Sequence, residues 1–462
     1  MRKHVLIIAR GIIVCCLLLA MFSACTPQSS GNTDPLHDPG TQSAEKTEIL
    51  LWTNQRADLV FREEKRAAFN NANPDLNVKM EVFTEDYATT LELAVASGQA
   101  PDIFQVLNNA RYYLDRNMLQ PLDKYVTDDL KQRYGNLFMI DEVNTIDGKL
   151  YTLAERGITF RLIYNKDIFE AVGLPGPPKT TEQMYDYAKQ ITEWGRKDGI
   201  YGYAMQLKST ASVGDRVIDQ TARRNGFFSY DFINGKFNFS VMKPILSVYR
   251  KMYEEGIMFP GIEGLEIDPL RTQFAAGKIG MYINGNWETA IYAENGQFPT
   301  KCNWGAVTIP GIGTENPSGK TNINNAGKSW GISISSEVPD LAWRYIEYLL
   351  EDDYLAEYQE KGYGTIVVPS AAKIAKFPDM IGAEDFAMKD TLDMIWPVSP
   401  ETAGLKFEGK NAYDTYAAII LGAVDIDAAL ADLTSRYNAG LNAGEKDGTV
   451  KRVVIPNFDP TK

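Results

Sequence analysis

The sequence predicts an α/β protein built from two lobes. Three observations favour this fold class: a length of 462 residues, a globular composition with 44% hydrophobic and 23% charged residues, and apolar strands that alternate with helices. At roughly 150 residues per domain, the chain has room for two large lobes once its N-terminal segment is set aside. The elements that support this prediction are taken in chain order below.

Residues 1–46 are expected to precede the folded part. Arg2 and Lys3 give a positive start, and the apolar run at 11–24 is shorter than the about 20 helical residues that span a bilayer. Small residues directly before Cys25 resemble the lipobox of bacterial lipoprotein signal peptides. That resemblance implies a signal peptide at 1–24, lipidation (palmitate) of Cys25 and a lipid anchor on the extracytoplasmic face of the cell membrane. A plain secretory signal is the alternative.

A tether and then an open parallel sheet are expected next. Residues 25–46 are rich in Thr, Pro, Ser, Gly and Asn and offer little apolar surface to bury, which is typical of a flexible tether. Residues 48–52 contain a continuous apolar run at 49–52, as in a strand buried on both faces, so Trp52 is expected in the core. The expected β-α-β-α-β elements are a strand at 48–52, a helix at 58–71, a strand at 76–83, a helix at 87–97 and a strand at 102–107.

The alternation resumes in the second half of the chain. The expected elements are a strand at 160–164, helices at 181–196 and 243–255, strands at 279–283 and 330–335, a helix at 339–350, a strand at 365–368 and a helical tail at 412–442. Sheets of this kind bind ligands at the carboxyl ends of their strands. Loops that follow strands are therefore the places to look for binding residues.

Composition excludes several kinds of chemistry. The 2 His, His4 and His37, both precede the folded part, so histidine triads, Cys-His dyads and His-ligated zinc are not expected. Only Cys302 of the 4 Cys falls in the folded part, which leaves no disulfide partner or cysteine metal site there. The net charge of −13 disfavours nucleic acid as a partner. We expect no cofactor and no metal.

One segment carries the most specific signal. In residues 274–287, Gly277 is expected to close a helix in the left-handed conformation, a buried strand follows, Asn284 and Gly285 form a turn, and Trp287 emerges at the strand end. The segment resembles the aromatic segment of family 1 extracellular solute-binding proteins, the maltose-binding-protein-like carbohydrate receptors of ABC importers. There the equivalent Trp stacks on a sugar ring.

Further segments resemble the same family in the same order. They are residues 97–104, a helix at 114–122, residues 148–151 and 162–169 around a first crossover, 329–334 at a second crossover and 362–369 at a third. The resemblance implies a type II periplasmic-binding-protein-like fold, in which parallel-rich sheets flanked by helices form two lobes joined by a three-crossover hinge. Lobe 1 would comprise 47–157 plus 332–364, and lobe 2 would comprise 158–331 plus 365–462. The family's proline after Tyr151 is absent here.

A sugar site needs flat aromatic platforms and polar side chains around the rim. The ligand-binding candidates, taken from strand ends, crossovers and the family match, are Asn54, Gln55, Arg56, Glu85, Asn108, Asn109, Glu155, Arg156, Asn286, Trp287, Trp330 and Trp396. Alternatives stay open for several of them. Trp287 is a platform or a core indole, Trp330 faces the cleft or packs the hinge, and Asn108 or Asn109 contacts the ligand or caps a helix.

The implied function is capture of a sugar or oligosaccharide and delivery to an ABC importer permease by a monomeric lipoprotein that catalyses no reaction. A secreted glycoside hydrolase is one alternative, because two carboxylates at a suitable distance would suffice. A receptor for a peptide, polyamine or anion is another, and Arg56 or Arg156 would suit a uronic acid. Residues 313–321 end in Gly319-Lys320-Thr321 but lack the spacing of a phosphate loop, so a surface loop is expected.

Overall fold

The computed structural model describes residues 46–56, 58–83, 86–107, 109–324, 329–389, 391–400 and 405–462. The predictions for the signal peptide, for the tether up to residue 45 and for lipidation of Cys25 lie outside these ranges. Within them, no helix combines the length and the apolar character needed to cross a membrane. Residues 46–462 group into one compact unit.

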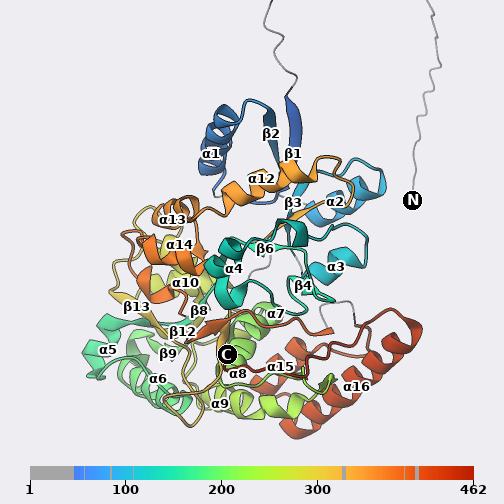
Figure 1. Ribbon diagram of the computed structural model, residues 1–462. Coiled ribbons are helices and arrows are strands. Elements are labelled where there is room, and N and C mark those ends of the chain that lie inside the picture. Colours follow the sequence, from blue (N-terminus) through green and yellow to red (C-terminus); the bar gives the residue numbers. More distant parts are fainter. Residues whose placement is uncertain are drawn as a thin grey trace, which may run out of the picture. The chain divides into compact units, whose positions relative to one another are not determined.

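The first lobe is built on a mixed sheet in the order β2-β1-β3-β15-β6 (Figure 1). Its strands are β1 (Thr47–Thr53), β2 (Leu76–Val82), β3 (Ile103–Val106), β15 (Ser329–Ile332) and β6 (Leu153–Ala154). Strand β1 pairs in parallel with β2 and β3, whereas β15 pairs antiparallel with β3 and β6. The apolar run predicted at 48–52 is β1, where Ile49 and Leu51 are buried, and Trp52 lies in the core as expected.

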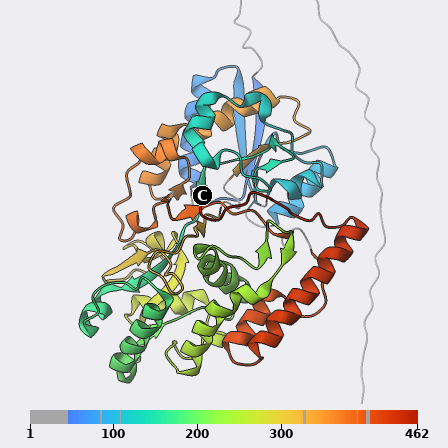
Figure 2. The ribbon, with the colours of Figure 1, turned by 60° about the horizontal axis from the view of Figure 1, so that its bottom comes forward.

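Helices from both ends of the chain cover this sheet. They are α1 (Leu59–Ala72), α2 (Tyr87–Ala96), α3 (Ala110–Leu114), α4 (Asp128–Tyr134), α12 (Pro339–Leu349), α13 (Asp352–Glu360) and α14 (Pro369–Ile374). Figure 2 shows the orange helices of the later chain beside the blue strands of the early chain. Phe69 of α1 packs on Tyr345 of α12, with ring centroids 4.9 Å apart. The lobe is therefore assembled from segments that are far apart in sequence.

The second lobe has a sheet in the order β13-β8-β12-β9. Its strands are β8 (Phe160–Asn165), β9 (Tyr201–Tyr203), β12 (Ile279–Gly285) and β13 (Trp304–Val307). Strand β12 pairs in parallel with β9 but antiparallel with β8, and β13 is also antiparallel to β8. Both sheets are thus mixed rather than parallel-rich, because strands entering from the crossovers run against their neighbours.

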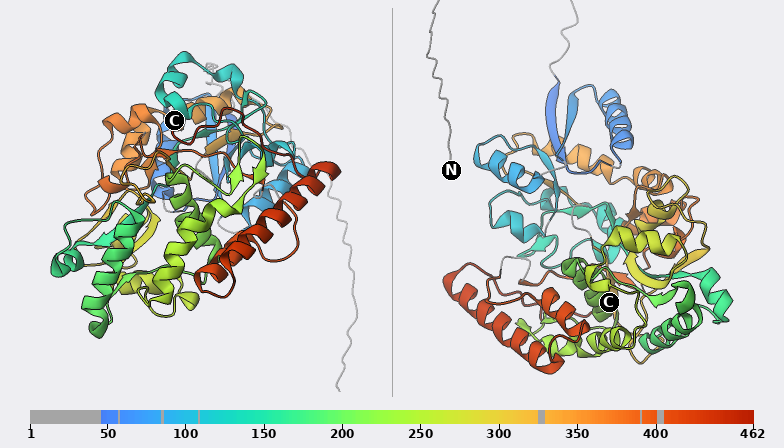
Figure 3. Two further views of the ribbon diagram at one scale, coloured as in Figure 1. Left: turned by 90° about the horizontal axis from the view of Figure 1, so that it is seen from below. Right: turned by 180° about the vertical axis from the view of Figure 1, so that it is seen from behind.

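The helices of the second lobe surround this sheet. They are α5 (Lys166–Val172), α6 (Thr181–Gly195), α7 (Thr210–Val213), the π-helical turn η4 (Gly214–Ile218), α8 (Asp219–Arg224), α9 (Lys243–Glu254), α10 (Ile267–Ala275), α11 (Glu288–Tyr292), α15 (Ala412–Ile420) and α16 (Ile426–Asp447). The Thr180 side chain caps α6 by accepting from the Gln183 N–H, which is worth about 1 kcal/mol. Figure 3 shows the red C-terminal helices running along the green ones.

Short strand pairs and 3₁₀ turns complete the fold. The pairs are β4 (Thr145–Ile146) with β5 (Lys149–Leu150), β7 (Arg156–Gly157) with β16 (Thr365–Ile366), β10 (Tyr230–Asp231) with β11 (Lys236–Phe237), and β14 (Thr321–Asn322) with β17 (Asp393–Met394). The 3₁₀ turns are η1 (Asp123–Tyr125), η2 (Gly135–Leu137), η3 (Arg196–Asp198), η5 (Phe239–Met242), η6 (Ile262–Gly264) and η7 (Glu384–Phe386).

Several predicted elements differ in detail. The helix expected at 114–122 is instead α3, which spans Ala110–Leu114 and begins earlier because Asn109 caps its start by accepting from the Tyr112 N–H. Asn284 and Gly285 continue β12 rather than forming a turn. The helical tail is two helices, since Gly422 adopts a φ of 70° between them. Gly277 does end α10 in the left-handed conformation, with a φ of 70°.

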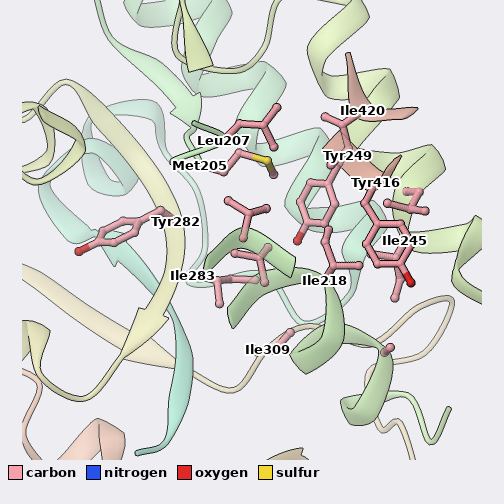
Figure 4. Close-up of a cluster of buried hydrophobic side chains, with 14 of the residues drawn as sticks. Met205, Leu207, Ile218, Ile245, Tyr249, Tyr282, Ile283, Ile309, Tyr416 and Ile420 are labelled. Atoms are coloured by element: carbon pink, nitrogen blue, oxygen red, sulfur yellow. The ribbon is translucent and has the colours of Figure 1, made fainter. Parts of the chain in front are cut away.

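Each lobe has its own hydrophobic core. The larger core belongs to the second lobe, and Figure 4 shows part of it, with Ile218, Tyr249 and Tyr416 converging beside Ile283 of β12. The first lobe has separate clusters on the two faces of its sheet. A small cluster of Val143, Ala154, Ile323, Val367 and Ile395 draws residues from all three crossovers. Separate cores linked by a minor cluster are what two lobes on a hinge require.

The crossovers pack closely at this minor cluster. Strand β7 of the first crossover pairs with β16 of the third, and Ile158 exchanges backbone hydrogen bonds with Asn324 of the second. A Cβ atom on Gly157 would lie 2.3 Å from the Ile323 side chain, so only glycine fits there. The lobe boundaries shift from those predicted: β15 places residues 329–331 in the first lobe, and α14 packs on α13 and α4 of that lobe.

Candidate ligand-binding site

A cavity of about 300 Å³ lies between the two lobes. Its first-lobe wall includes Leu107 at the end of β3, Asn109 and Thr152, with Ser329 at the start of β15. Its second-lobe wall is formed by Asp215, Asp219, Arg223, Phe228, Asn322, Trp396 and Tyr413, among others. The carboxyl ends of first-lobe strands thus face a polar and aromatic wall of the other lobe. A cavity with this lining suits a polar ligand that has at least one apolar face.

Trp396 supplies the aromatic wall and is held rigidly. Its indole Nε1–H donates to the Lys320 carbonyl at 2.8 Å, and its backbone N–H donates to Asn322 Oδ1 at 2.9 Å. Phe458 of the C-terminal segment packs against it, with ring centroids 5.1 Å apart. The Trp396 ring, 3% exposed, is thus held at its edge and against a second aromatic ring, and it forms part of the cavity lining.

Arg223 is buried against this aromatic wall. Its guanidinium carbon lies 4.3 Å from the Phe228 ring centroid and 5.8 Å from that of Trp396. Only 8% of Arg223 is exposed, yet its Nε and Nη1 have no hydrogen-bond partner in the part of the chain that the structure describes. Buried donors without acceptors are costly, so this guanidinium has unused capacity.

Asp215 stands on the same wall. No hydrogen bond or ion pair reaches its carboxylate from any described residue, although it lines the cavity. Burial raises the pKa of the Asp215 carboxyl above its ordinary value, while the nearby Arg223 and Arg216 guanidinium groups act in the opposite direction. Asp219, one turn further on, accepts from the Tyr413 hydroxyl at 2.9 Å. Among the described residues, the cavity is therefore lined by one carboxylate without a hydrogen-bond donor, that of Asp215, and by one guanidinium with two unpartnered N–H groups, that of Arg223.

A π-helical turn places Asp215 in the cavity. Residues Gly214–Ile218 form η4, and turns of this kind are rare and often occur at functional sites. The Tyr413 ring covers Gly214 so closely that a Cβ atom there would lie 2.0 Å from Cδ1 of the ring. Glycine is required at this position because the tyrosine must lie flat on the backbone. The same tyrosine then reaches Asp219 with its hydroxyl.

A second cavity, of about 510 Å³, lies beside the first and third crossovers. Arg156, Asn286 and Trp287 line it, together with Tyr363 and Phe377. The Trp287 indole Nε1–H donates to Glu288 at 2.8 Å. Three of the predicted contacts therefore gather here, whereas Asn109 and Trp396 gather in the interlobe cavity.

Arg216 and Asn286 tie this second cavity to its surroundings. The Arg216 guanidinium carbon lies 4.9 Å from the Trp287 ring centroid. Asn286 donates to Thr365 Oγ1 at 2.7 Å and so ties the end of β12 to the third crossover. Because Arg216 follows Asp215 directly in η4, one short turn connects the environments of Trp287 and Trp396.

Four predicted contacts instead belong to a buried ion network at the first crossover. Arg62 pairs with Glu155 at 2.5 Å and with Asp58 at 2.8 Å, and Arg156 pairs with Glu155 at 3.2 Å. The Trp330 Nε1–H donates to Glu155, and Arg156 donates to Gln55. Glu155 is 1% exposed and Trp330 has no exposed surface. The structure therefore places Glu155 and Trp330 in the interior rather than on a cavity wall, with Trp330 packed on the hinge side of the first lobe, whereas Arg156 belongs both to this network and to the lining of the second cavity.

The remaining candidates are distributed as follows. Asn54 is partly buried and accepts from the neighbouring Gln55 side chain, and Arg56 is exposed; neither lines the two cavities. Glu85 and Asn108 lie outside the described residues. Asn109 caps α3 and also lines the interlobe cavity, so the helix-cap alternative is confirmed, and its contact with a ligand stays a prediction.

Sequence reasoning missed Asp215, Asp219 and Arg223. Their spacing of four residues places them on one side of a helix, which is a usable signal. Such spacing is common on solvated helix faces. It points to a binding site only because the structure shows the aromatic rings of Phe228 and Trp396 beside Arg223. No group of three or more His, Cys, Asp or Glu within the described ranges could hold a metal ion.

Two lobes with separate cores and a ligand-sized cavity between them define a two-lobe binding protein. Comparison with known proteins identifies the family within this class. A family profile described as bacterial extracellular solute-binding protein matches residues 52–356, and the chain belongs to that family. The family consists of extracellular substrate-binding proteins rather than enzymes. Its members bind their substrates outside the cytoplasm. The resemblance drawn from the sequence motifs is thereby confirmed at the family level.

Individual relatives are distant but cover much of the chain. The maltotriose-binding protein of Pyrococcus abyssi is 22% identical over 321 residues, which is 67% of this chain and 64% of the relative. The apo-form of RafE from Streptococcus pneumoniae superposes with a TM-score of 0.68 at 19% identity and covers 87% of this chain and 99% of its own. The cyclic α-maltosyl-1,6-maltose binding protein of Arthrobacter globiformis gives 0.69 at 19% identity, with coverage of 87% and 100%. These superpositions confirm the two-lobe α/β fold.

Proposed function

We propose that this protein captures a sugar or oligosaccharide in the interlobe cavity and delivers it unchanged to an ABC importer. The observation that carries the proposal is the pairing of a fixed indole, Trp396, with the unused carboxylate of Asp215 in one cavity. A sugar presents C–H groups on its faces and hydroxyls around its edge, and it needs both kinds of partner. Relatives named for maltotriose and for cyclic α-maltosyl-1,6-maltose support the carbohydrate class.

The proposed contacts divide between the lobes. The second lobe contributes the Trp396 platform and the polar wall, and the first lobe contributes Asn109 from the end of β3. Rotation of the lobes about the packed crossovers would bring these groups together around the ligand. Trp287 and Asn286 are a second placement, favoured by the aromatic lining of the neighbouring cavity.

The cellular setting completes the proposal. We propose a monomeric lipoprotein anchored through Cys25, with residues 25–46 as a leash that lets the lobes reach a permease in the same membrane. Mass spectrometry of the membrane-extracted protein tests the anchor. A diacylglyceryl-modified Cys25 at the mature N-terminus is expected, and a soluble protein cleaved elsewhere would contradict it.

Binding without catalysis is the distinguishing prediction. Calorimetry and thermal shift with raffinose, maltotriose, mannotriose, trigalacturonate and spermidine should show a neutral saccharide that raises the melting temperature. Chromatography of the same mixtures should show the sugar intact. Release of smaller sugars, lost on replacing Asp215 or Asp219, would establish a glycoside hydrolase instead, and preference for spermidine would establish a polyamine receptor.

Two variants test the site. Trp396→Ala should weaken saccharide binding strongly, because it removes the platform while Phe458 stays in place. Trp194→Ala is the matched control, since this Trp is 48% exposed on α6 and lines neither cavity. Equal affinity of both variants would remove Trp396 from the site.

A further inference from the structure

We propose that Asp215 is the specificity-determining carboxylate of the interlobe cavity and that it selects ligands with a pair of neighbouring uncharged hydroxyl groups. The inference rests on the proposed carbohydrate function and adds to it the chemical feature that the site recognises. It applies to a residue that the sequence motifs did not single out.

The first step is that the Asp215 carboxylate has acceptor capacity but no donor. It lines the cavity, and no hydrogen bond or ion pair from the described ranges reaches it. A carboxylate has about four lone-pair positions and only accepts hydrogen bonds. Two neighbouring hydroxyls would donate one hydrogen bond to each oxygen, whereas a single peptide N–H supplies only one donor.

The second step concerns charge. Arg223 and Asp219 are the other charged side chains described along this cavity, so its formal sum is one negative charge. An anionic ligand would meet that excess at short range, which disfavours it. Arg223 is also covered by Phe228 and Trp396, with Nε and Nη1 shielded from solvent. We assign Arg223 a positioning role: it holds a positive charge near Asp215 and keeps that carboxylate usable in its charged form.

The third step is that Asp215 is held in place at a cost in stability. The π turn, the glycine under Tyr413 and the bond from that tyrosine to Asp219 all fix this stretch of helix. An unpaired, half-buried carboxylate does not stabilise the fold, so its placement is accounted for by a ligand. A structural carboxylate behaves like Glu155, which its partners saturate.

The test uses the full mature chain and the substitution Asp215→Asn, with Asp186→Asn as the matched control. Asp186 is exposed on α6, has no described partner, and undergoes the same change in charge and shape. Calorimetry with raffinose, maltotriose, mannotriose, trigalacturonate and chitosan trimer gives the affinities. Thermal melts without ligand give the stability.

Asp215→Asn should lose roughly 10- to 100-fold in affinity for the neutral trisaccharide that the wild type binds. Its unliganded melting temperature should equal or exceed that of the wild type, which a merely structural carboxylate would not allow. Unchanged affinity, or a fall in unliganded stability, would overturn the inference while leaving the carbohydrate function intact. Wild-type preference for trigalacturonate or for the cationic chitosan trimer would overturn it too. Failure of every saccharide to bind would instead overturn the proposed function.

Discussion

Two groups of charged side chains, one beside the first crossover and one on the second-lobe wall of the interlobe cavity, are built differently. The hinge ion network comprises Asp58, Arg62, Glu155 and Arg156, and each member has at least one ion-pair partner within it. The cleft charges comprise Asp215, Asp219 and Arg223, and no ion pair among them is found within the described residues. The formal charges of the hinge ion network sum to zero, and those of the cleft charges sum to one negative charge.

The difference separates structure from recognition. Partners from α1, the first crossover and α13 reach every member of the hinge ion network, and among its side chains only Asp58 Oδ1 is buried without a hydrogen-bond partner in the described residues, so little capacity is left for a ligand. Among the cleft charges, Asp215 and Arg223 have polar atoms without a partner in the described residues, whereas Asp219 accepts from Tyr413; all three line a cavity. A polar residue after a strand therefore belongs to a site only if the fold leaves its hydrogen bonds unused.

The strongest way to break this comparison is Arg62→Ala. The substitution removes the closer of two cations from the buried Glu155 and Asp58 and leaves only Arg156, at 3.2 and 3.6 Å, which should cost about 3–5 kcal/mol of unfolding free energy. Chemical denaturation measures this loss. The control is Lys451→Ala, since Lys451 and Asp147 form an exposed pair (54% and 78% exposed) whose loss should cost less than about 1 kcal/mol. Equal losses in the two variants would show that the network is not structural.

The next largest effect is expected at the two tryptophans that line cavities. Trp396→Ala should weaken saccharide binding by about 2 kcal/mol, or roughly thirtyfold, as is common for a buried aromatic contact. Trp287→Ala should change the affinity less than about threefold, because Glu288 and Arg216 already engage its indole. Titration calorimetry on both variants decides between the cavities. The reverse order of effects would place the ligand beside the first and third crossovers.

A smaller effect is expected at Asn286. Asn286→Ala removes its bonds to Thr365 and to the Gly157 carbonyl, which should lower stability by about 1 kcal/mol. A double-mutant cycle with Thr365→Val measures how much of this comes from the bond between the two side chains. Full additivity would mean that this bond contributes nothing to the hinge.

The smallest effect is a pH dependence in the unliganded protein. Since burial raises the pKa of Asp215, its carboxyl binds a proton more readily folded than unfolded, and its ionisation lowers stability as pH rises. Asp215→Asn should therefore stabilise the protein slightly at pH 7. The gain should vanish below an ordinary carboxyl pKa of about 3.9. Melting curves from pH 7 to 4 measure the difference, and a gain that grows on acidification would contradict the assignment.

The sequence predicted most of the fold because local signals and tertiary context agree. The run Ile49–Trp52 is strand β1, the helix expected after Thr180 begins where its side chain caps it, and Gly277 ends α10 as expected. Mixed sheet directions were missed, since strand patterns give burial but not the direction of a neighbour that arrives through a crossover.

The candidate site was less predictable for a related reason. Trp396 and Asn109 line the interlobe cavity, but Glu155 meets Arg62, a residue far away in sequence, and is used up. Nothing local in the sequence shows whether such a partner exists. The sequence did not point to Asp215 because the feature that fixes its position, the close packing of the Tyr413 ring on Gly214, joins two segments that are far apart in sequence.

The packing of Phe458 behind Trp396 has a practical consequence. Phe458 forms part of the rear of the proposed binding wall, so a reporter group attached beside this residue would lie against that wall. A fluorescent group placed there without a spacer should shift its signal when the cavity fills. The segment around Phe458 is thus a natural attachment point for a sensor, and a poor one for an inert handle.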